Sequence, residues 1–238
     1  MQNIIIICTA LLPVAILVCY ICLKDKRSPE PSRLLLKAFF YGWLSLPLSF
    51  CVSKPSEYLG LYSNEVTDVV GAVSLSFFGA AIPEELAKLF VLWLLLRKNS
   101  YFDEKMDGIV YAVCVSMGFA ALENIMYLFS NSESCLTVGI LRAIFAVPGH
   151  FCFGILMGYY YSLAKFYPLS PKKNMIIVLL APIVVHGLYD SILFVINVSP
   201  KISCILLIVF LVFCFRMWKY ASKRIEEHLK RDNIDCIQ

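Results

Sequence analysis

Seven long apolar runs divide the chain, and they limit its fold more than any other feature. They lie at residues 4–23, 34–53, 66–97, 108–130, 137–164, 174–196 and 202–219. About 20 apolar residues cross the hydrocarbon core as one helix, which satisfies its own backbone hydrogen bonds there. With 60% hydrophobic and 16% charged residues, the 238-residue chain has no length left for a soluble domain. We therefore predict an all-α polytopic membrane protein, a bundle of seven to eight transmembrane helices in one domain, residues 1–238.

The third run determines whether the bundle has seven or eight transmembrane helices. Residues 66–97 would form roughly 50 Å of helix at about 1.5 Å per residue, which is too long for one simple crossing. Pro83 and Gly79 lie near its middle, and proline removes a helical hydrogen bond. The run therefore predicts either two helices or one broken helix whose first half is interfacial or re-entrant.

Basic residues distinguish the two sides of the membrane. If the third run crosses once, one side receives the basic residues of loops 24–33, 97–105 and 165–173 and of the tail at 219–238, and the other receives only Lys54 and Lys201. Basic loops stay in the cytoplasm, so the N-terminus is expected outside and the C-terminus inside. The basic cytoplasmic tail is expected to lie on the anionic lipid surface. The net charge of +4 is spread over these short loops and gives no indication of nucleic-acid binding.

Ionisable residues interrupt the third run directly after Pro83. They are Glu84, Glu85 and Lys88. Each charge near the bilayer centre costs roughly 2.5–3.5 kcal/mol, so the cluster requires a hydrated cavity lined by protein. At helical spacing Lys88 is close to both carboxylates and can hold one of them charged, while the other exchanges protons with water. A buried Glu–Lys pair that only joins two helices is the alternative interpretation.

Three further runs carry polar groups at a similar depth. These polar groups are Glu123 with Asn124 in the first of the three runs, His150 in the second, and His186 with Asp190 in the third. Counted from the cytoplasmic edge at about 1.5 Å per residue, these groups and Glu85 lie roughly 18–24 Å deep. His186 and Asp190 share one helix face, so Asp190 can orient His186. The common depth predicts one intramembrane polar site.

Glutamate and histidine side chains around a shared cavity are suited to activating water. One group takes a proton from water while a second donates to the oxyanion. The same groups suit Zn²⁺, with Glu85, Glu123, His150 and His186 as ligands. The residues leave zinc and a metal-free glutamate mechanism both open. The sequence contains no His-Glu-x-x-His, Gly-x-Gly-Asp or Gly-x-Ser-Gly motif of other intramembrane proteases.

Two other features of the fifth run have simpler interpretations. Gly154 and Gly158 are spaced to permit close helix packing. Arg142 is within two turns of the end of the run, so we expect its side chain to extend to the membrane surface.

The polar motifs, taken in order, resemble the PrsW family of intramembrane proteases. They are Glu84-Glu85-x-x-Lys88, Phe119-x-x-x-Glu123-Asn124, His150-x-x-x-Gly154 and His186-x-x-x-Asp190, which span most of a motif-bearing core at residues 66–196. In the related CPBP group, which includes CAAX prenyl endopeptidases and immunity-type proteins, histidine more usually replaces Glu123. An arginine one position after Lys88 ends the first motif there. Both departures favour PrsW.

The resemblance implies a function and a set of site residues. The function is site-1 cleavage of an anti-sigma factor, a single-span membrane protein, in a bacterial cell membrane. Glu84 and Glu85 would form the catalytic pair. The rest of the implied site is Glu123, His150 and His186, supported by Lys88, Asn124 and Asp190.

Other classes of membrane protein also use buried ionisable residues. A proton- or ion-coupled transporter would carry similar groups, but it would often show repeated halves and paired broken helices, and only one run here is broken. A CPBP-type immunity protein or prenyl-protein protease is a further alternative. A pure scaffold would tolerate replacement of the whole polar set.

Overall fold

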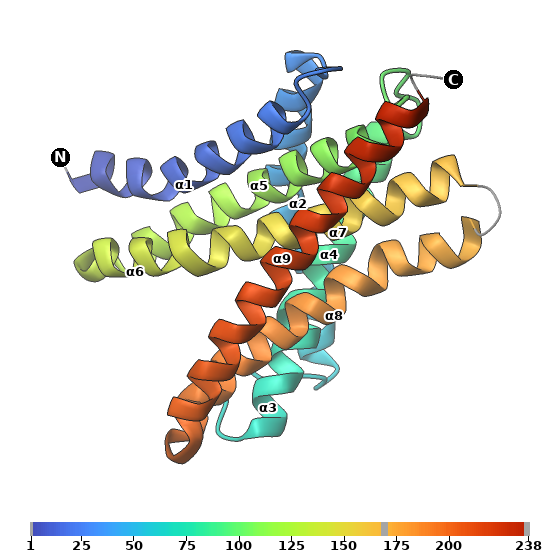
Figure 1. Ribbon diagram of the computed structural model, residues 1–238. Coiled ribbons are helices and arrows are strands. Elements are labelled where there is room, and N and C mark those ends of the chain that lie inside the picture. Colours follow the sequence, from blue (N-terminus) through green and yellow to red (C-terminus); the bar gives the residue numbers. More distant parts are fainter. Residues whose placement is uncertain (1, 168–170, 236–238) are drawn as a thin grey trace.

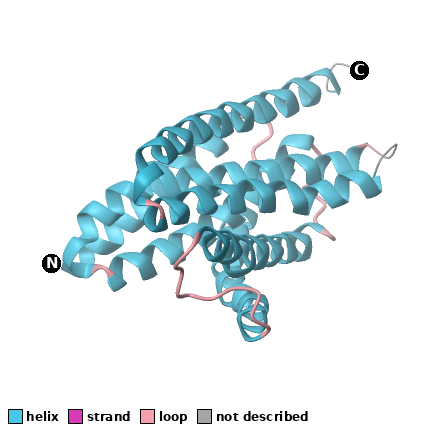
Figure 2. Ribbon diagram, turned by 90° about the horizontal axis from the view of Figure 1, so that it is seen from below, coloured by secondary structure: helices cyan, strands magenta, loops and turns pink. Residues whose placement is uncertain are grey.

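The computed structural model describes residues 2–167 and 171–235, and these residues form helices joined by short turns (Figures 1 and 2). The helices are α1 (Gln2–Lys24), α2 (Ser32–Tyr58), α3 (Val69–Ser74), η1 (Leu75–Ala81), α4 (Ile82–Leu96), α5 (Lys105–Ser130), η2 (Ser132–Ser134), α6 (Cys135–Leu141), η3 (Arg142–Ala146), α7 (Val147–Phe166), α8 (Pro171–Val198), η4 (Pro200–Ile202) and α9 (Ser203–Asp235). No strand occurs in the described part of the chain.

Six helical stretches of the described residues are long and apolar enough to cross a membrane. They are Asn3–Lys24, Ser32–Tyr58, Lys105–Ser130, Ser132–Phe166, Lys173–Val198 and Pro200–Ile234. The path through α3, η1 and α4 corresponds to the third apolar run, and it consists of three shorter helices that are not among these six. The prediction of an all-α polytopic membrane protein is confirmed.

The third run is continuous, so the expected break at its centre is wrong. Its middle section, η1, is a π-helix, and the N–H of Ile82 donates to the carbonyl of Phe77, five residues earlier. Pro83 follows at once, in the first turn of α4. Proline has no N–H and its ring clashes with the carbonyl four residues before it. The wider π turn changes the register at this point, and the chain passes Pro83 without separating into two helices.

The same combination of a π turn and a proline occurs before α7. In η3 the N–H of Val147 donates to the carbonyl of Arg142, again five residues earlier, and Pro148 follows. The two π segments directly precede Glu84 and Glu85 in one case and His150 in the other. Both changes of helical register therefore lie next to polar residues that the sequence singled out.

Helix α5 forms the centre of the bundle and packs against α1, α2, α7 and α9. Its close approach to α7 depends on glycine: a Cβ atom at Gly158 would lie 2.3 Å from the carbonyl oxygen of Gly108. A Cβ atom at Gly154 would lie 2.9 Å from the side chain of Ser116. The predicted role of the Gly154–Gly158 pair in close packing is confirmed.

The basic loops meet at one end of the bundle. Arg27, after α1, donates to Asn233 near the end of α9, and Lys165 at the end of α7 donates to the carbonyl of Phe102 before α5. Lys105 lies 3.3 Å from Asp232 of α9. Seven net crossings require these segments to share a side, which agrees with the grouping of charges in the sequence. The tail is part of this end: as far as Asp235 it continues α9, which crosses the bundle diagonally in Figure 1.

Candidate active site

A cavity of about 420 Å³ opens among the helices that carry the polar residues. Its wall contains Ala80, Glu84, Glu123, Tyr127, Leu141, Arg142, Phe145, Ala146, His150, Phe153, His186, Tyr189, Asp190, Leu193, Phe194, Leu207 and Phe210. Most of these are apolar or aromatic, and the few ionisable groups come from four different segments of the bundle. Such a pocket is typical of a binding or catalytic site.

The two adjacent glutamates have different surroundings. Glu85 is fully buried, and its Oε1 accepts from Lys88 Nζ at 2.8 Å and lies 2.9 Å from His186 Nδ1. The Glu84 side chain keeps 14% of its surface exposed and lines the cavity, with Oε2 at 3.3 Å from Lys88 Nζ. Glu85 therefore holds Lys88 and His186 in place, whereas Glu84 is available to a molecule in the cavity.

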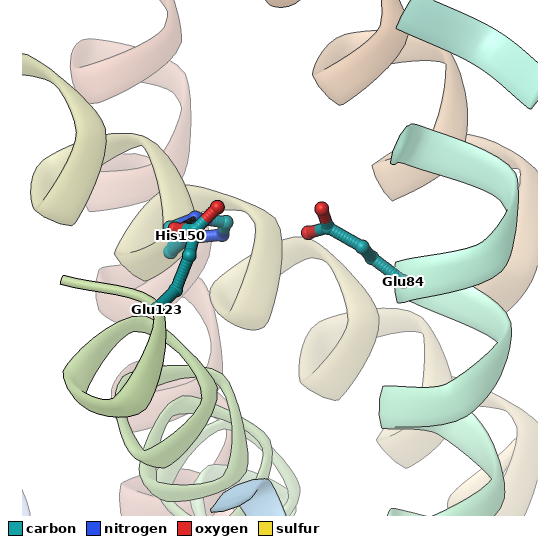
Figure 3. A group of neighbouring side chains, drawn as sticks. All are labelled: Glu84, Glu123 and His150. Atoms are coloured by element: carbon teal, nitrogen blue, oxygen red, sulfur yellow. Dashed lines mark hydrogen bonds and ion pairs between the residues drawn. The ribbon is translucent and has the colours of Figure 1, made fainter. Parts of the chain in front are cut away.

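Two residues face Glu84 across the cavity. Figure 3 shows Glu84 extending from α4 toward Glu123 and His150, which come from α5 and α7. His150 Nε2 lies 3.0 Å from Glu123 Oε2, and the backbone carbonyl of His150 accepts from Ser116 Oγ at 2.6 Å. The sequence predicts a similar depth for these residues, and the structure brings them together: one ligand atom from each of the three lies within 4.8 Å of the others.

Lys88 connects the two halves of the site. Its Nζ lies 3.3 Å from His150 Nδ1 in addition to its contacts with both glutamates, and it sits 4.0 Å above the ring of Phe119. The lysine is 1% exposed. A buried ammonium group needs such compensation, because an unpaired charge in this environment would cost several kcal/mol.

His186 is oriented from both sides. Its Nε2 lies 3.2 Å from Asp190 Oδ2, as the spacing of the two residues along one helix face predicts, and Nδ1 faces Glu85. The ring also stacks on Phe153, with centroids 4.5 Å apart and planes inclined by 17°. These contacts leave the imidazole little freedom to turn.

Arg142 belongs to the site, and the expectation that it extends to the membrane surface is wrong. Its Nη2 donates to Glu123 Oε2 at 2.5 Å and its Nε donates to Asn124 Oδ1 at 2.6 Å. Asn124 in turn donates to the backbone carbonyl of Ala10 in α1. The carboxylate of Glu123 is mostly withdrawn from water, so a charged partner stabilises it more than the surface would stabilise the arginine. The spacing of 18 to 19 residues between Arg142 and its partners gave no signal of this contact.

The donor groups fit a zinc-type ion. Glu84, Glu123 and His150 offer two carboxylates and one imidazole within 4.8 Å of one another, and Glu84, Glu85 and His186 form a second such group. Three ligands of this kind with an open position are typical of catalytic zinc. Glu84 belongs to both groups although the sequence-based ligand set omitted it. Lys88 and Arg142 already supply positive charge beside these carboxylates.

The chain is similar to known proteins over most of its length. Residues 30–217 match the family described as PrsW family intramembrane metalloprotease. The chain is 34% identical over 224 residues to Protease PrsW of Clostridioides difficile (strain 630), an alignment that covers 92% of this chain and 90% of that protein. It is 37% identical over 192 residues to Protease PrsW of Oceanobacillus iheyensis, covering 79% and 82% of the two chains.

A third relative extends the same pattern. Protease PrsW of Bacillus subtilis (strain 168) is 35% identical over 190 residues, which cover 79% of this chain and 82% of that protein. No solved structure matches the chain. The family match spans the four motifs and every residue that lines the cavity, and the chain belongs to the PrsW family of intramembrane metalloproteases.

Proposed function

We propose that this protease makes the first cut in a single-span membrane protein, and that its substrate class is the anti-sigma factors. The observation that carries the proposal is the convergence of Glu84, Glu123 and His150 on a cavity inside a membrane-spanning bundle. The ordered motifs of the PrsW family support the substrate class. A proton-coupled transporter is less well supported, because the polar groups surround one cavity and the chain matches a family of proteases over residues 30–217.

In the proposed reaction Glu84 is the general base. It takes a proton from a water molecule, whose oxygen attacks the carbonyl carbon of the scissile peptide bond, and it then gives that proton to the leaving nitrogen as the C–N bond breaks. Arg142, fixed by Glu123 on the cavity wall, supplies a positive charge where the carbonyl oxygen becomes negative. Glu85 and Lys88 act as positioning residues behind this wall.

The metal of this metalloprotease is proposed to be zinc, which Glu123 and His150 would hold on the wall of the cavity that faces Glu84. When bound, the ion would polarise the attacking water and the substrate carbonyl. The protein's own residues determine where the ion can bind. His150 is fixed by its contacts with Ser116 and Glu123, and its ring is therefore already oriented toward the cavity.

A cleavage assay with purified protein tests the proposal. Full-length protein in detergent would be mixed with a single-span anti-sigma factor, and with an unrelated single-span protein as a control. We expect cleavage of the first, loss of cleavage with a zinc chelator, and recovery on adding Zn²⁺. Activity unaffected by chelation would refute the zinc assignment, and no cleavage of any anti-sigma factor would refute the substrate class.

A further inference from the structure

A second group of acidic side chains lies at the other end of α5, remote from the active site. Asp25 follows α1, Glu104 is the N-cap residue of α5, and Asp107 is in the first turn of that helix. Sixteen residues separate Asp107 from Glu123, which corresponds to roughly 24 Å along a helix. The proteolytic mechanism uses none of these three carboxylates.

The oxygens of this group are close enough to share one ion. One carboxylate oxygen from each of Asp25, Glu104 and Asp107 lies within 4.8 Å of the other two. Calcium–oxygen bonds are 2.3–2.6 Å long, so two oxygens on the same ion can be up to about 5 Å apart. The ligand atoms are all carboxylate oxygens, which suit Ca²⁺ and Mg²⁺ rather than a transition metal.

Asp25 is the member of the group that points to a missing cation. The residue is 4% exposed, and its carboxylate has no hydrogen bond or ion pair to the described residues. Buried carboxylates are normally paired or bound to metal, and the described residues give this one no such partner.

The other two carboxylates are already held in position. Asp107 Oδ2 accepts from the backbone N–H groups of Asp103 at 2.9 Å and Glu104 at 2.6 Å, and the Glu104 side chain accepts in return from the N–H of Asp107. This capping box fixes both side chains on the start of α5. Asp25 reaches them from the α1–α2 turn, and Glu30 beside it accepts from the Tyr111 hydroxyl. These hydrogen bonds therefore hold the ligand oxygens of Glu104 and Asp107 in place without an ion.

We propose that Asp25, Glu104 and Asp107 bind a divalent cation of the Ca²⁺ or Mg²⁺ class, which ties the α1–α2 turn to the start of α5. The ion neutralises carboxylates that otherwise repel one another. It also stabilises the end of the bundle where α9 docks, because Asp232 of α9 accepts from the backbone N–H groups of Lys105 and Met106 next to the site. The site is structural and separate from the catalytic metal.

Thermal unfolding of the purified full-length protein in detergent tests the site without an activity assay. After treatment with chelator, Ca²⁺ or Mg²⁺ is added in steps. At about a 100-fold excess over Kd we expect the Tm to rise by about 5–10 °C. Asp25→Asn, which keeps the side-chain shape and removes the charge, should lose most of that rise. Asp103→Asn is the matched control, an exposed acid of the neighbouring loop outside the ligand group, and it should keep the rise.

Glu84→Gln separates this site from the active site. The Tm rise should persist in Glu84→Gln, whatever that variant does to proteolysis. Glu104→Gln provides a second test if Asp25→Asn does not fold. The proposal is overturned if neither ion raises the Tm of the natural protein, if Asp25→Asn responds to the ions as the natural protein does, or if Glu84→Gln alone removes the response.

Discussion

At the scale of single residues, the site gives two adjacent glutamates different surroundings. Glu84 and Glu85 are adjacent, but only Glu84 lines the cavity, and Glu85 is enclosed with Lys88 and His186. A fully buried carboxylate that accepts from the Lys88 ammonium group is poorly placed to exchange protons with water in the cavity. The geometry therefore favours Glu84 as the base and Glu85 as the residue that keeps the buried cation in place.

Paired substitutions distinguish these two roles. Glu84→Gln should reduce cleavage by at least about 10²- to 10⁴-fold, the usual contribution of a general base, with little change in the Tm. Glu85→Gln should lower the free energy of unfolding by about 3 kcal/mol as well as activity, because it leaves Lys88 poorly compensated. Cleavage rates and thermal unfolding in detergent measure both effects. A Glu84→Gln variant with normal activity would show that the base is another residue.

Arg142 is the second residue whose role can be tested by itself. Arg142→Gln removes the charge beside Glu123 but can still donate a hydrogen bond, so we expect kcat to fall about 10²-fold while substrate binding changes little. The matched control is Arg216→Gln on the exposed face of α9, which should cleave normally. Equal activities of the two variants would contradict a role for Arg142 in the reaction.

At the scale of helices, two π segments direct side chains into the site. In a helix each residue turns the chain by about 100°, so one extra residue in a turn rotates everything that follows it. Pro83 and Pro148 each follow such a turn, whereas Pro13, Pro47, Pro55 and Pro182 lie inside α-helices. Proline alone therefore does not produce the π turn. The packing of η1 and η3 around the cavity contributes the rest.

Pro148→Ala tests the coupling between the π turn and the site. Alanine restores an N–H and removes the clash, so η3 can relax toward an α-helix and turn His150 away from Glu123. We expect at least a tenfold loss of cleavage with unchanged helix content by circular dichroism. Pro182→Ala is the control inside α8 and should retain activity. Full activity of Pro148→Ala would show that the π turn serves only helix packing and does not orient His150.

At the scale of the whole molecule, the charged loops predict the orientation of the protein in the membrane. The segments that meet near Asp232 carry most of the basic residues outside the apolar runs, and on this ground we propose that this end lies in the cytoplasm. Single cysteines at Ser63 and Ser100, in a chain without its native cysteines, should then differ in labelling by an impermeant reagent applied from outside. We expect labelling at Ser63 and protection at Ser100. The opposite pattern would invert the proposed topology, and labelling of both would refute the number of crossings.

The position of the cut follows from this orientation. In the proposed orientation the polar groups would lie roughly 18–24 Å from the cytoplasmic edge of a hydrocarbon core about 30 Å thick. A substrate helix must unwind where it is cut, because its hydrogen-bonded backbone does not expose a carbonyl. We expect cleavage in the outer half of the substrate's span or just outside it, as mass spectrometry of the fragments would show. A cut near the cytoplasmic end would contradict the proposed depth.

Much of the architecture follows from the sequence because its causes are local. The length of each apolar run determines whether a helix can cross the membrane, and the cost of burying charge makes Glu84, Glu123, His150 and His186 conspicuous in those runs. Their common depth follows from the rise per residue. The family is also accessible at this level, since four ordered motifs carry it.

Only the tertiary structure determined the helical register around the site and the contacts between residues that are far apart in the chain. The π turn η1 precedes Glu84 and Glu85, and the π turn η3 precedes His150; no local pattern in the apolar runs predicted either of them. The pairing of Arg142 with Glu123 and the meeting of Asp25 with Asp107 join segments far apart in the chain. Hydrophobic periodicity specifies which residues avoid water, but the contacts among the buried polar groups depend on the relative rotation of whole helices, and only the packed bundle determines that rotation.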